Sequence, residues 1–360
     1  MLNSFTLVNL MRTIEWDTLR NELRLIDQRK LPGELVIVSL SDYHQVAKAI
    51  REMVVRGAPA IGVTGAFGMA LAAHYSVTSN KKEMKAELEE AAKELQGARP
   101  TAVNLRWGLN RMLEVAELWE GTVTELSTAL LNTAQKIADE DVAINKRMAV
   151  HGASLIDDGD IILHHCNTGA LAAVDWGTAL GVIRMAHDQG KTIHVLVDET
   201  RPMLQGSRLT AWELQQYKIS FDIIPDGAAG FFLKSGQVKK VFFGGDRVAA
   251  NGDVANKIGT YMLALAAYDN SVPNCAVIPT STIDLSIDHG GLIPIEERDP
   301  EEVLQIQIDG KYVAPIGASA RNPAFDITHH RLISVIVTEN GLVYPPFREN
   351  LFKAVWGNLK

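Results

Sequence analysis

Ile161-Ile162-Leu163-His164-His165-Cys166-Asn167-Thr168-Gly169-Ala170 is the stretch around which the rest of the chain is organised. It begins as an apolar run, ends in two histidines and a cysteine, and then breaks into Asn-Thr-Gly. The apolar, small-residue pattern that follows predicts a helix over 171–188. A strand, a tight turn and a helix in this order place the turn where ligands bind in open α/β sheets. The thiol of Cys166 therefore stands where it can do chemistry.

Length and composition narrow the class of protein. The chain has 360 residues, of which 47% are apolar, which is long for one domain and comfortable for two. No apolar run approaches the length of a membrane span, and no basic region precedes the short apolar stretch within residues 1–12. We therefore expect neither a membrane helix nor a signal peptide. The only two cysteines, Cys166 and Cys275, cannot form a disulfide framework and indicate the cytoplasm.

The charge pattern argues against a nucleic-acid partner. The formal net charge is −8, and no block of lysine and arginine is longer than a pair. A nucleic-acid-binding protein usually shows a basic stripe. A phosphorylated metabolite needs only a few local cations, so an acidic protein can still bind one.

Residues 1–135 are predicted to form a mostly helical N-terminal domain with a small β element. The β element consists of the apolar pieces Leu23–Asp27 and Leu35–Ser39, which a Pro-Gly turn separates. Helices are expected over 46–54, 60–74, 81–96, 102–119 and from 122 to about 156. Glycines 62, 65 and 68 recur every three residues, which gives one helix a flat ridge that another helix can approach closely.

Residues 136–360 are predicted to form a Rossmann-like domain, because strands and helices alternate from residue 160 onward. The strand candidates are apolar throughout, as expected for strands that are covered on both faces of a doubly wound, mostly parallel sheet. These strands are expected over 161–165, 193–197, 220–224, 239–244, 275–279 and 332–337. The helices between them are expected over 171–188, 207–217, 227–235 and 253–268.

Polar residues follow successive strands of this predicted sheet. In a parallel sheet these strand ends lie on one edge, where they would form a cleft that contains a thiol, several carboxylates, arginines and a lysine. The five clusters are 165–169, 198–206, 225–228, 244–257 and 279–282. Their recurrence, and not any single motif, predicts a functional site.

The residues alone leave two readings of Cys166 open. A cysteine that ends an apolar strand is most often an inert core residue. A helix N-terminus after Asn-Thr-Gly would lower the pKa of the thiol and favour a reactive group. Cys275 lies inside an apolar strand and is expected to be structural. Neither cysteine nor histidine shows the spacing of metal ligands, so no metal site is predicted.

Three aspartates are candidates for a general acid or base. Asp246 follows two glycines at a strand end, where an apolar strand behind it could raise its pKa by desolvation. Asp198 and Asp226 are equally placed, and the sequence does not rank the three. The Gly-x-Gly-x-x-Gly pattern does not follow the first strand, and no Walker-type loop occurs. A dehydrogenase or a kinase is therefore disfavoured.

Longer runs of sequence resemble one enzyme family. They include Arg56-Gly57-Ala58-Pro59-Ala60-Ile61-Gly62, His165-Cys166-Asn167-Thr168-Gly169-Ala170-Leu171-Ala172 and Asp246-Arg247-Val248-Ala249-Ala250-Asn251-Gly252-Asp253, and further runs begin at Arg99, Asp198, Gln205, Asn256, Ile295 and Asn322. Over nearly its whole length the chain resembles the methylthioribose-1-phosphate isomerases. The wider family also holds ribose-1,5-bisphosphate isomerases and regulatory subunits of a translation-initiation nucleotide-exchange factor.

The resemblance implies an aldose–ketose isomerase of methionine salvage that works as a homodimer without metal or organic cofactor. Its substrate would be 5-methylthioribose 1-phosphate and its product 5-methylthioribulose 1-phosphate. Carried over by motif, Cys166 and Asp246 are the catalytic pair, with Asp246 as the proton donor. The substrate-binding residues implied in the same way are Arg56, Gly57, Ala58, Arg99, Gln205, Asn256 and Lys257. Arginines from the N-terminal domain suit a phosphate, and the cleft is then expected between the two domains.

Two positions depart from the family pattern. The family usually has alanine or a similar residue where this chain has Gly245, and a bulkier or polar pair where it has Gly227-Ala228. These differences leave isomerisation of another 5-substituted or 5-deoxy ribose 1-phosphate as an alternative. A non-catalytic regulatory subunit that binds a phosphorylated ligand is the second alternative.

Overall fold

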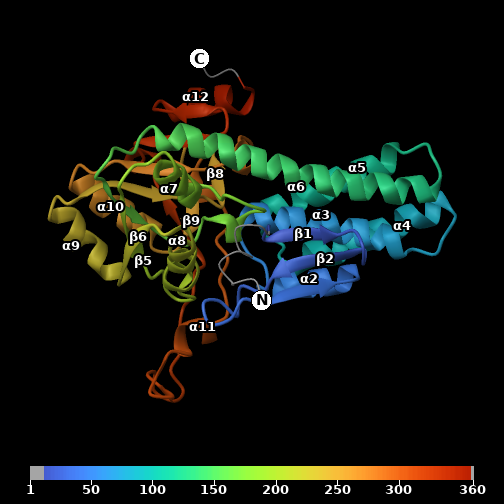
Figure 1. Cartoon of the computed structure of the whole chain (residues 1–360), viewed down its shortest axis with the longest axis horizontal. Coiled ribbons are helices and arrows are strands. Elements are labelled where there is room, and N and C mark those ends of the chain that lie inside the picture. The colour runs from blue at the N-terminus through green and yellow to red at the C-terminus, as the bar shows by residue number, and fades with distance from the viewer. Residues whose placement is uncertain (1–11, 358–360) are drawn as a thin grey trace. The chain divides into compact units, whose positions relative to one another are not determined.

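The computed structural model describes residues 12–357, which form two compact units. The expectation about a signal peptide falls on residues 1–12, of which 1–11 lie outside the described residues. Of these residues, one unit holds 12–146 together with Thr168–Gly177, and the other holds Arg147–Asn167 and 178–357. Figure 1 shows the elements of both units. Among helices within residues 12–357, none is long and apolar enough to cross a membrane.

The first unit combines a small antiparallel sheet with a group of helices, as the sequence predicts. The sheet has the order β1 (Ile14–Asp17), β2 (Glu22–Ile26) and β3 (Ile37–Leu40), of which β1 was not predicted. The helices are α2 (Tyr43–Arg51), α3 (Ala58–Tyr75), α4 (Lys81–Ala98), α5 (Val103–Leu118) and most of α6 (Val123–Ala153). Helices α3, α4 and α5 pack side by side (Figure 1).

The glycine ridge of α3 lets the helices approach closely, as predicted. A Cβ atom on Gly62 would lie 2.6 Å from the carbonyl oxygen of Asn104 on α5. On the facing side, a Cβ atom on Gly108 would lie 2.4 Å from the carbonyl oxygen of Gly62. These distances leave no room for a methyl group, so the two backbones touch at this point. Helix α3 is buried on nearly all sides, which explains its lack of a polar face.

Asp141 of α6 holds the segment Thr168–Gly177 in the first unit. Its Oδ2 atom accepts hydrogen bonds from the backbone N–H of Val174 at 2.8 Å and from the side-chain amide of Asn145 at 3.1 Å. Burial raises the pKa of Asp141 to about 7, although both hydrogen bonds oppose the shift. The folded chain thus favours the protonated carboxyl group.

Replacing Asp141 with asparagine is expected to remove a pH dependence of stability. Folding raises the pKa of Asp141, so between about pH 4 and pH 7 the folded chain holds the proton more tightly than the unfolded chain. The stabilisation is complete below about pH 4 and is lost as the pH rises towards 7, on the order of 1 kcal/mol for each pH unit. Urea unfolding at several pH values measures it. Asp139→Asn, an exposed change of the same charge on α6, should keep the wild-type slope, and an unchanged slope in Asp141→Asn would contradict the account.

The second unit is built on a seven-stranded sheet. Its order is β16-β15-β10-β7-β4-β5-β6, and all neighbours are parallel except β15 and β16. The strands are β4 (Ile161–His164), β5 (His194–Asp198), β6 (Ser220–Ile224), β7 (Val238–Phe243), β10 (Asn274–Val277), β15 (Val335–Thr338) and β16 (Gly341–Val343). The six predicted strands are all present, and the doubly wound, Rossmann-like sheet is confirmed.

The strand order places a topological switch point between β4 and β7. From β4 the chain first adds β5 and β6 on one side, and then crosses to β7 on the other side of β4. In open sheets of this kind, ligands bind at the carboxyl ends of the strands that flank such a point. Cys166 follows β4 and Asp246 follows β7, so both predicted catalytic residues stand there.

Helices and short turns connect these strands. The helices are α7 (Ala179–Asp188), α8 (Ala211–Tyr217), α9 (Ala229–Lys234), α10 (Thr260–Asp269), α11 (Glu301–Leu304) and α12 (Phe347–Val355), and the turns are η1 (Ala170–Ala172), η2 (Gly206–Thr210), η3 (Asp226–Ala228), η4 (Thr280–Thr282), η5 (Gly290–Leu292) and η6 (His330–Leu332).

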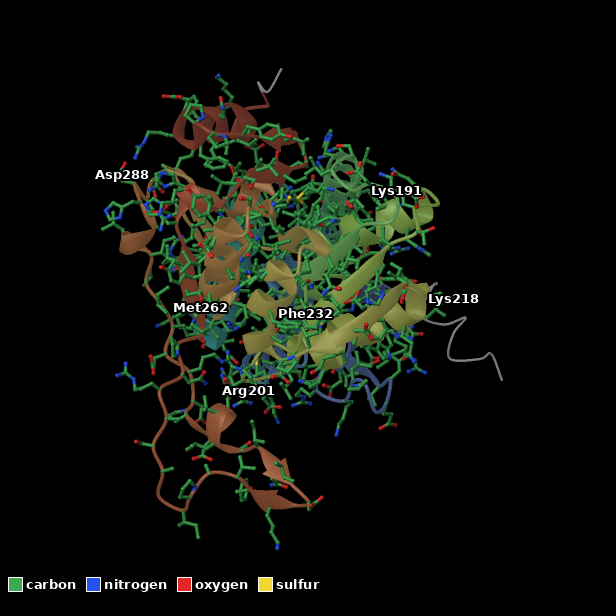
Figure 2. All side chains as sticks on the ribbon, turned by 90° about the vertical axis from the view of Figure 1, so that its left-hand side faces the viewer. Lys191, Arg201, Lys218, Phe232, Met262 and Asp288 are labelled. Atoms are coloured by element: carbon green, nitrogen blue, oxygen red, sulfur yellow. The ribbon has the colours of Figure 1, made fainter. Side chains whose placement is uncertain are left out.

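A second, smaller sheet corrects one prediction. Its order is β11 (Ile283–Asp284), β8 (Arg247–Ala249), β9 (Val254–Lys257) and β14 (Phe325–Thr328). The helix predicted over 253–268 is therefore wrong in its first part, because β9 pairs there with β8 and β14. The hairpin of β12 (Gln307–Ile308) and β13 (Lys311–Tyr312) projects away from the body of this unit (Figure 2).

Candidate active site

Cys166 is buried, with 6% of its surface exposed, and its backbone is fixed on both sides. Its N–H donates to Oγ1 of Thr200 at 2.9 Å, and its carbonyl accepts from Oγ1 of Thr210 at 2.7 Å. The residue has φ 65°, a left-handed conformation that a non-glycine residue adopts at a cost. The surrounding hydrogen bonds offset this strain and hold the thiol at the carboxyl end of β4.

The helix expected directly after Cys166 is absent at 171–178, and α7 begins only at Ala179. In its place, residues 170–172 form a short 3₁₀ turn. The carbonyls that a helix would use are taken by side chains from elsewhere, since Thr13 binds the carbonyl of Ala170 and Gln28 binds that of Leu171. An α-helix dipole therefore cannot be the cause of a reactive thiol here.

Asp246 follows Gly244-Gly245 at the end of β7, the strand next to β4. Its N–H donates to the carbonyl of Ala255 at 2.8 Å, which ties it to β9. The side chain is partly buried. A Cβ atom on Gly245 would lie 2.8 Å from the end of the Ile278 side chain, so glycine lets the chain pass close to the neighbouring strand before Asp246.

His165 forms a buried pair that the sequence reasoning did not find. Its Nδ1 lies 2.9 Å from Oδ2 of Asp198, and its Nε2 lies 3.0 Å from the carbonyl oxygen of Ile258. Burial opposes a charge on the ring, but the hydrogen bond with Asp198 and its negative charge raise the pKa of His165. The available signal is a polar residue at the carboxyl end of each of two neighbouring buried strands.

Asp226, the third candidate aspartate, accepts hydrogen bonds from the backbone. One carboxylate oxygen of Asp226 accepts the N–H of Thr200 and the other accepts that of Arg201, each at 2.7 Å. Asp226 therefore shapes the turn after β5, and Asp198 pairs with His165. The structure thus gives Asp198 and Asp226 local partners that account for their positions.

The other predicted residues of the second unit lie near the same sheet edge. Gln205 is buried, and its Oε1 has no hydrogen-bond donor among residues 12–357. The side-chain amide of Asn256 donates to Oγ1 of Thr260 at 3.0 Å. The ammonium group of Lys257 donates to the carbonyl of Ala324 at 3.0 Å and lies 4.8 Å from the ring centre of Phe325. Asn256 and Lys257 end β9, and Gln205 precedes a π-helical turn.

Arg56, Gly57, Ala58 and Arg99 belong to the first unit. The Nε of Arg56 donates to Oε1 of Gln28 at 3.1 Å, and the amide of Gln28 in turn donates to the carbonyl of Leu171. Ala58 begins α3, and Arg99 directly follows α4 as its C-cap. The loop before α3 is thereby tied to the segment that follows Cys166 in sequence.

Gly57→Ala is expected to destabilise the protein by about 3 kcal/mol or more, because a small side chain would overlap a backbone. Gly57 has φ 101°, and its Cβ atom would lie 2.4 Å from the carbonyl oxygen of Ala172. Gly159 also has a positive φ, 85°, but a Cβ atom there would have no neighbour within 4 Å. Gly159→Ala should therefore cost only about 1 kcal/mol of conformational strain. Denaturant unfolding of both variants measures the difference, and equal losses would refute the close contact.

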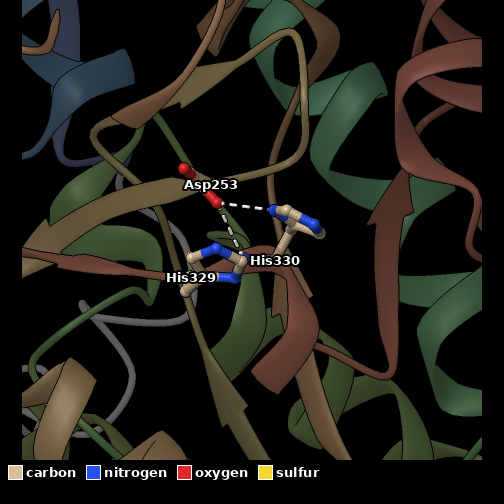
Figure 3. A group of neighbouring side chains, drawn as sticks. All are labelled: Asp253, His329 and His330. Carbon is tan, nitrogen blue, oxygen red and sulfur yellow. Dashed lines mark hydrogen bonds and ion pairs between the residues drawn. The ribbon is translucent and has the colours of Figure 1, made fainter. Parts of the chain in front are cut away.

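Among residues 12–357, two groups of side chains each bring three metal-ligating atoms within 4.8 Å of one another. One is His165, Asp198 and Asp226, and the other is Asp253, His329 and His330, shown in Figure 3. Asp253 accepts four hydrogen bonds, two of them from His330, which lower its pKa to about 2 against the effect of burial. A metal would have to replace these bonds, so they favour a structural role for the Asp253 group.

Cys275 and His164 are also buried, and neither has a role in the proposed reaction. Burial raises the pKa of Cys275 to about 12, which keeps this thiol protonated, as expected for a structural cysteine. Burial, together with the neighbouring His165, lowers the pKa of His164 to about 3 and keeps that ring neutral.

Known proteins share this sequence and fold. Residues 54–345 match the model of the Initiation factor 2 subunit family. The chain belongs to this family. Within the family it is 49% identical over 345 residues to methylthioribose-1-phosphate isomerase 1 of Pseudothermotoga lettingae, which covers 96% of this chain and 98% of that protein.

Two solved structures share the fold closely. One is 5-methylthioribose 1-phosphate isomerase from Pyrococcus horikoshii OT3, with 45% identity, a TM-score of 0.88 and 96% of each chain covered. The other is translation initiation factor eIF-2B, subunit delta, from A. fulgidus, with 42% identity and a TM-score of 0.85, which covers 96% of this chain and 99% of that chain.

Proposed function

We propose that this chain is an aldose–ketose isomerase that converts 5-methylthioribose 1-phosphate into 5-methylthioribulose 1-phosphate in methionine salvage. The observation that carries the proposal is the placement of Cys166 and Asp246 after the two strands that flank the switch point of the sheet. The near-complete match to relatives that bear this activity in their names supports the choice of substrate.

The substrate dictates what the site must do. Its C1 carries a phosphate, so the furanose ring cannot open as that of a free sugar does, and the ring oxygen needs a proton as its bond to C1 breaks. Asp246 supplies that proton as a general acid. The hydrogen on C2 then moves to C1, and the C2 hydroxyl releases its proton to solvent as a carbonyl forms, which balances the proton that Asp246 must regain for the next turnover. C2 is oxidised while C1 is reduced, so the reaction needs no external oxidant or reductant.

The proposed binding residues match the groups of this substrate. Guanidinium groups form paired hydrogen bonds with phosphate oxygens, a role we assign to Arg56 and Arg99. Gly57 and Ala58 offer backbone N–H groups at the start of α3. The buried Oε1 of Gln205 lacks a donor among the described residues, and a sugar hydroxyl would provide one. Asn256 and Lys257 complete the polar set.

Hydrogen reaches C1 by one of two routes, and Cys166 has a different role in each. In the first, a base removes the C2 proton and an enolate-like intermediate forms, and the thiol shuttles the proton. In the second, hydride shifts directly from C2 to C1, and the thiol only stabilises developing charge. Reaction in deuterated water separates the routes, because solvent deuterium at C1 of the product requires the exchangeable proton of the first route.

The regulatory-subunit reading remains the alternative, since the A. fulgidus structure has nearly the same fold. Turnover decides between them, because a subunit that only binds ligand forms no ketose. We expect ketose formation from 5-methylthioribose 1-phosphate, with kcat/KM about 10-fold or more above that for 5-deoxyribose 1-phosphate, which lacks the methylthio group. Equal kcat/KM values would indicate that the enzyme accepts a broader range of 5-substituents. If neither substrate were turned over, the proposed enzymatic activity would be refuted.

We further propose that the active form is a cytoplasmic homodimer. The family resemblance suggests the dimer, and the use of only two cysteines suits a reducing compartment. Light scattering on the purified protein tests the dimer, because a mass of one chain at assay concentrations would contradict it.

A further inference from the structure

His165 lies between three segments that carry residues of the proposed site. It precedes Cys166 at the end of β4, contacts Asp198 at the end of β5, and contacts Ile258, which directly follows Lys257 of β9. Only 1% of the surface of the His165 side chain is exposed. A Cβ atom on Gly259 would lie only 2.9 Å from Cε1 of the ring. The imidazole is thus enclosed, and its position is set by all three segments.

Hydrogen bonding fixes the protons of this ring. The carbonyl oxygen of Ile258 can only accept, so Nε2 carries a hydrogen and donates it. One further proton lies between Nδ1 and Oδ2 of Asp198, whichever atom holds it. The pair therefore satisfies both ring nitrogens at once. A substitution at His165 leaves at least one buried partner without its hydrogen bond, which is costly in a site of low dielectric.

We infer that His165 is a positioning residue for the proposed isomerase, whose imidazole holds the Cys166 segment in register with the segment of Asn256 and Lys257. The inference rests on the proposed function. The backbone of Cys166 is already fixed by Thr200 and Thr210, and β9 is held by its pairing with β8 and β14 and by the bond from Asp246 to Ala255. The bond to Ile258 adds a direct link between the Cys166 segment and the carboxyl end of β9. Loss of this bond lets the substrate-binding groups shift while the thiol stays, and a shift near 1 Å can cost about 10²-fold in rate.

Two substitutions of His165 each keep a different one of the two contacts of the ring. Asparagine is short and reaches only towards Asp198, whereas glutamine places its amide near the Nε2 position and keeps a donor for Ile258. We expect His165→Asn to raise KM about 10-fold or more and to lower kcat, and His165→Gln to raise KM about threefold. Both constants refer to the folded enzyme, quantified by circular dichroism and size exclusion.

His194→Asn is the matched control. His194 also has partners on both ring nitrogens, Ser220 at 2.8 Å and Asp222 at 3.0 Å, but it begins β5 at the opposite end of the strand. It should keep the wild-type KM and kcat.

The outcomes separate the inference from the proposed function. Absence of turnover in the wild-type enzyme contradicts the proposed function itself. Wild-type turnover with unchanged KM and kcat in the folded His165 variants overturns the inference, because a merely structural role lowers only the amount of folded enzyme. If His165→Asn yields no folded protein, His165→Gln decides in the same way.

Discussion

Replacing Asp246 with asparagine is expected to lower turnover of 5-methylthioribose 1-phosphate by about 10²–10⁴-fold, the usual contribution of a general acid. Asparagine has nearly the same shape but cannot release a proton to the ring oxygen. The backbone bond from residue 246 to Ala255 does not depend on the side chain, so the fold should persist. Steady-state kinetics with equal amounts of folded protein measures the effect.

The matched control for this variant is Asp288→Asn. Asp288 is an exposed carboxylate in an ion pair with Arg348, so its replacement changes the net charge equally without touching the sheet edge. Its turnover should equal that of the wild type. Wild-type turnover in Asp246→Asn would show that Asp246 is not the proton donor. Asp198 and Asp226 would then be the remaining candidates.

Cys166→Ser is expected to lower kcat by about 100-fold or more. A serine hydroxyl is close in size to a thiol, so the backbone N–H of residue 166 should still donate to Thr200, and Thr210 should still donate to its carbonyl. The hydroxyl ionises far less readily than a thiol and is less polarizable, so it neither shuttles a proton nor stabilises developing charge as well.

Cys275→Ala provides the control for Cys166→Ser. The thiol of Cys275 is buried within β10 and its pKa is raised to about 12, so it takes no part in the proposed reaction. The variant loses packing and some stability, but its turnover per folded molecule should match the wild type. Full activity in Cys166→Ser would show that Cys166 is an inert buried residue and takes no part in the reaction.

The central sheet could be predicted because most of its six parallel strands are rich in apolar residues, such as Ile161–His164, and are bounded by polar or glycine breaks. The edge strand β6 (Ser220–Ile224) is the least apolar of them and is mostly exposed. Strand β9 could not. Only Ile258 and Gly259 separate its residues Val254–Lys257 from a true helix, and pairing with β8 and β14 overrides their local pattern. The short strands β8 and β11 depend on the same non-local pairing.

In the candidate site too, local features could be predicted from the sequence and long-range contacts could not. The positions of Cys166 and Asp246 followed from the strand ends, which are local features. The His165–Asp198 pair joins residues 33 apart, and the loss of the expected helix after Cys166 results from Thr13 and Gln28, which lie more than a hundred residues away in sequence. Long-range hydrogen bonds of this kind leave no periodic pattern in a single sequence.

The most direct test of the central claim is a ³¹P NMR time course of 5-methylthioribose 1-phosphate with the wild-type protein and with Asp246→Asn. The account predicts that the signal of the acetal phosphate is replaced by that of the ketose phosphate with the wild type, without added metal or cofactor, and that it persists with the variant. An unchanged spectrum with folded wild-type protein, or equal rates for the two proteins, would contradict the account.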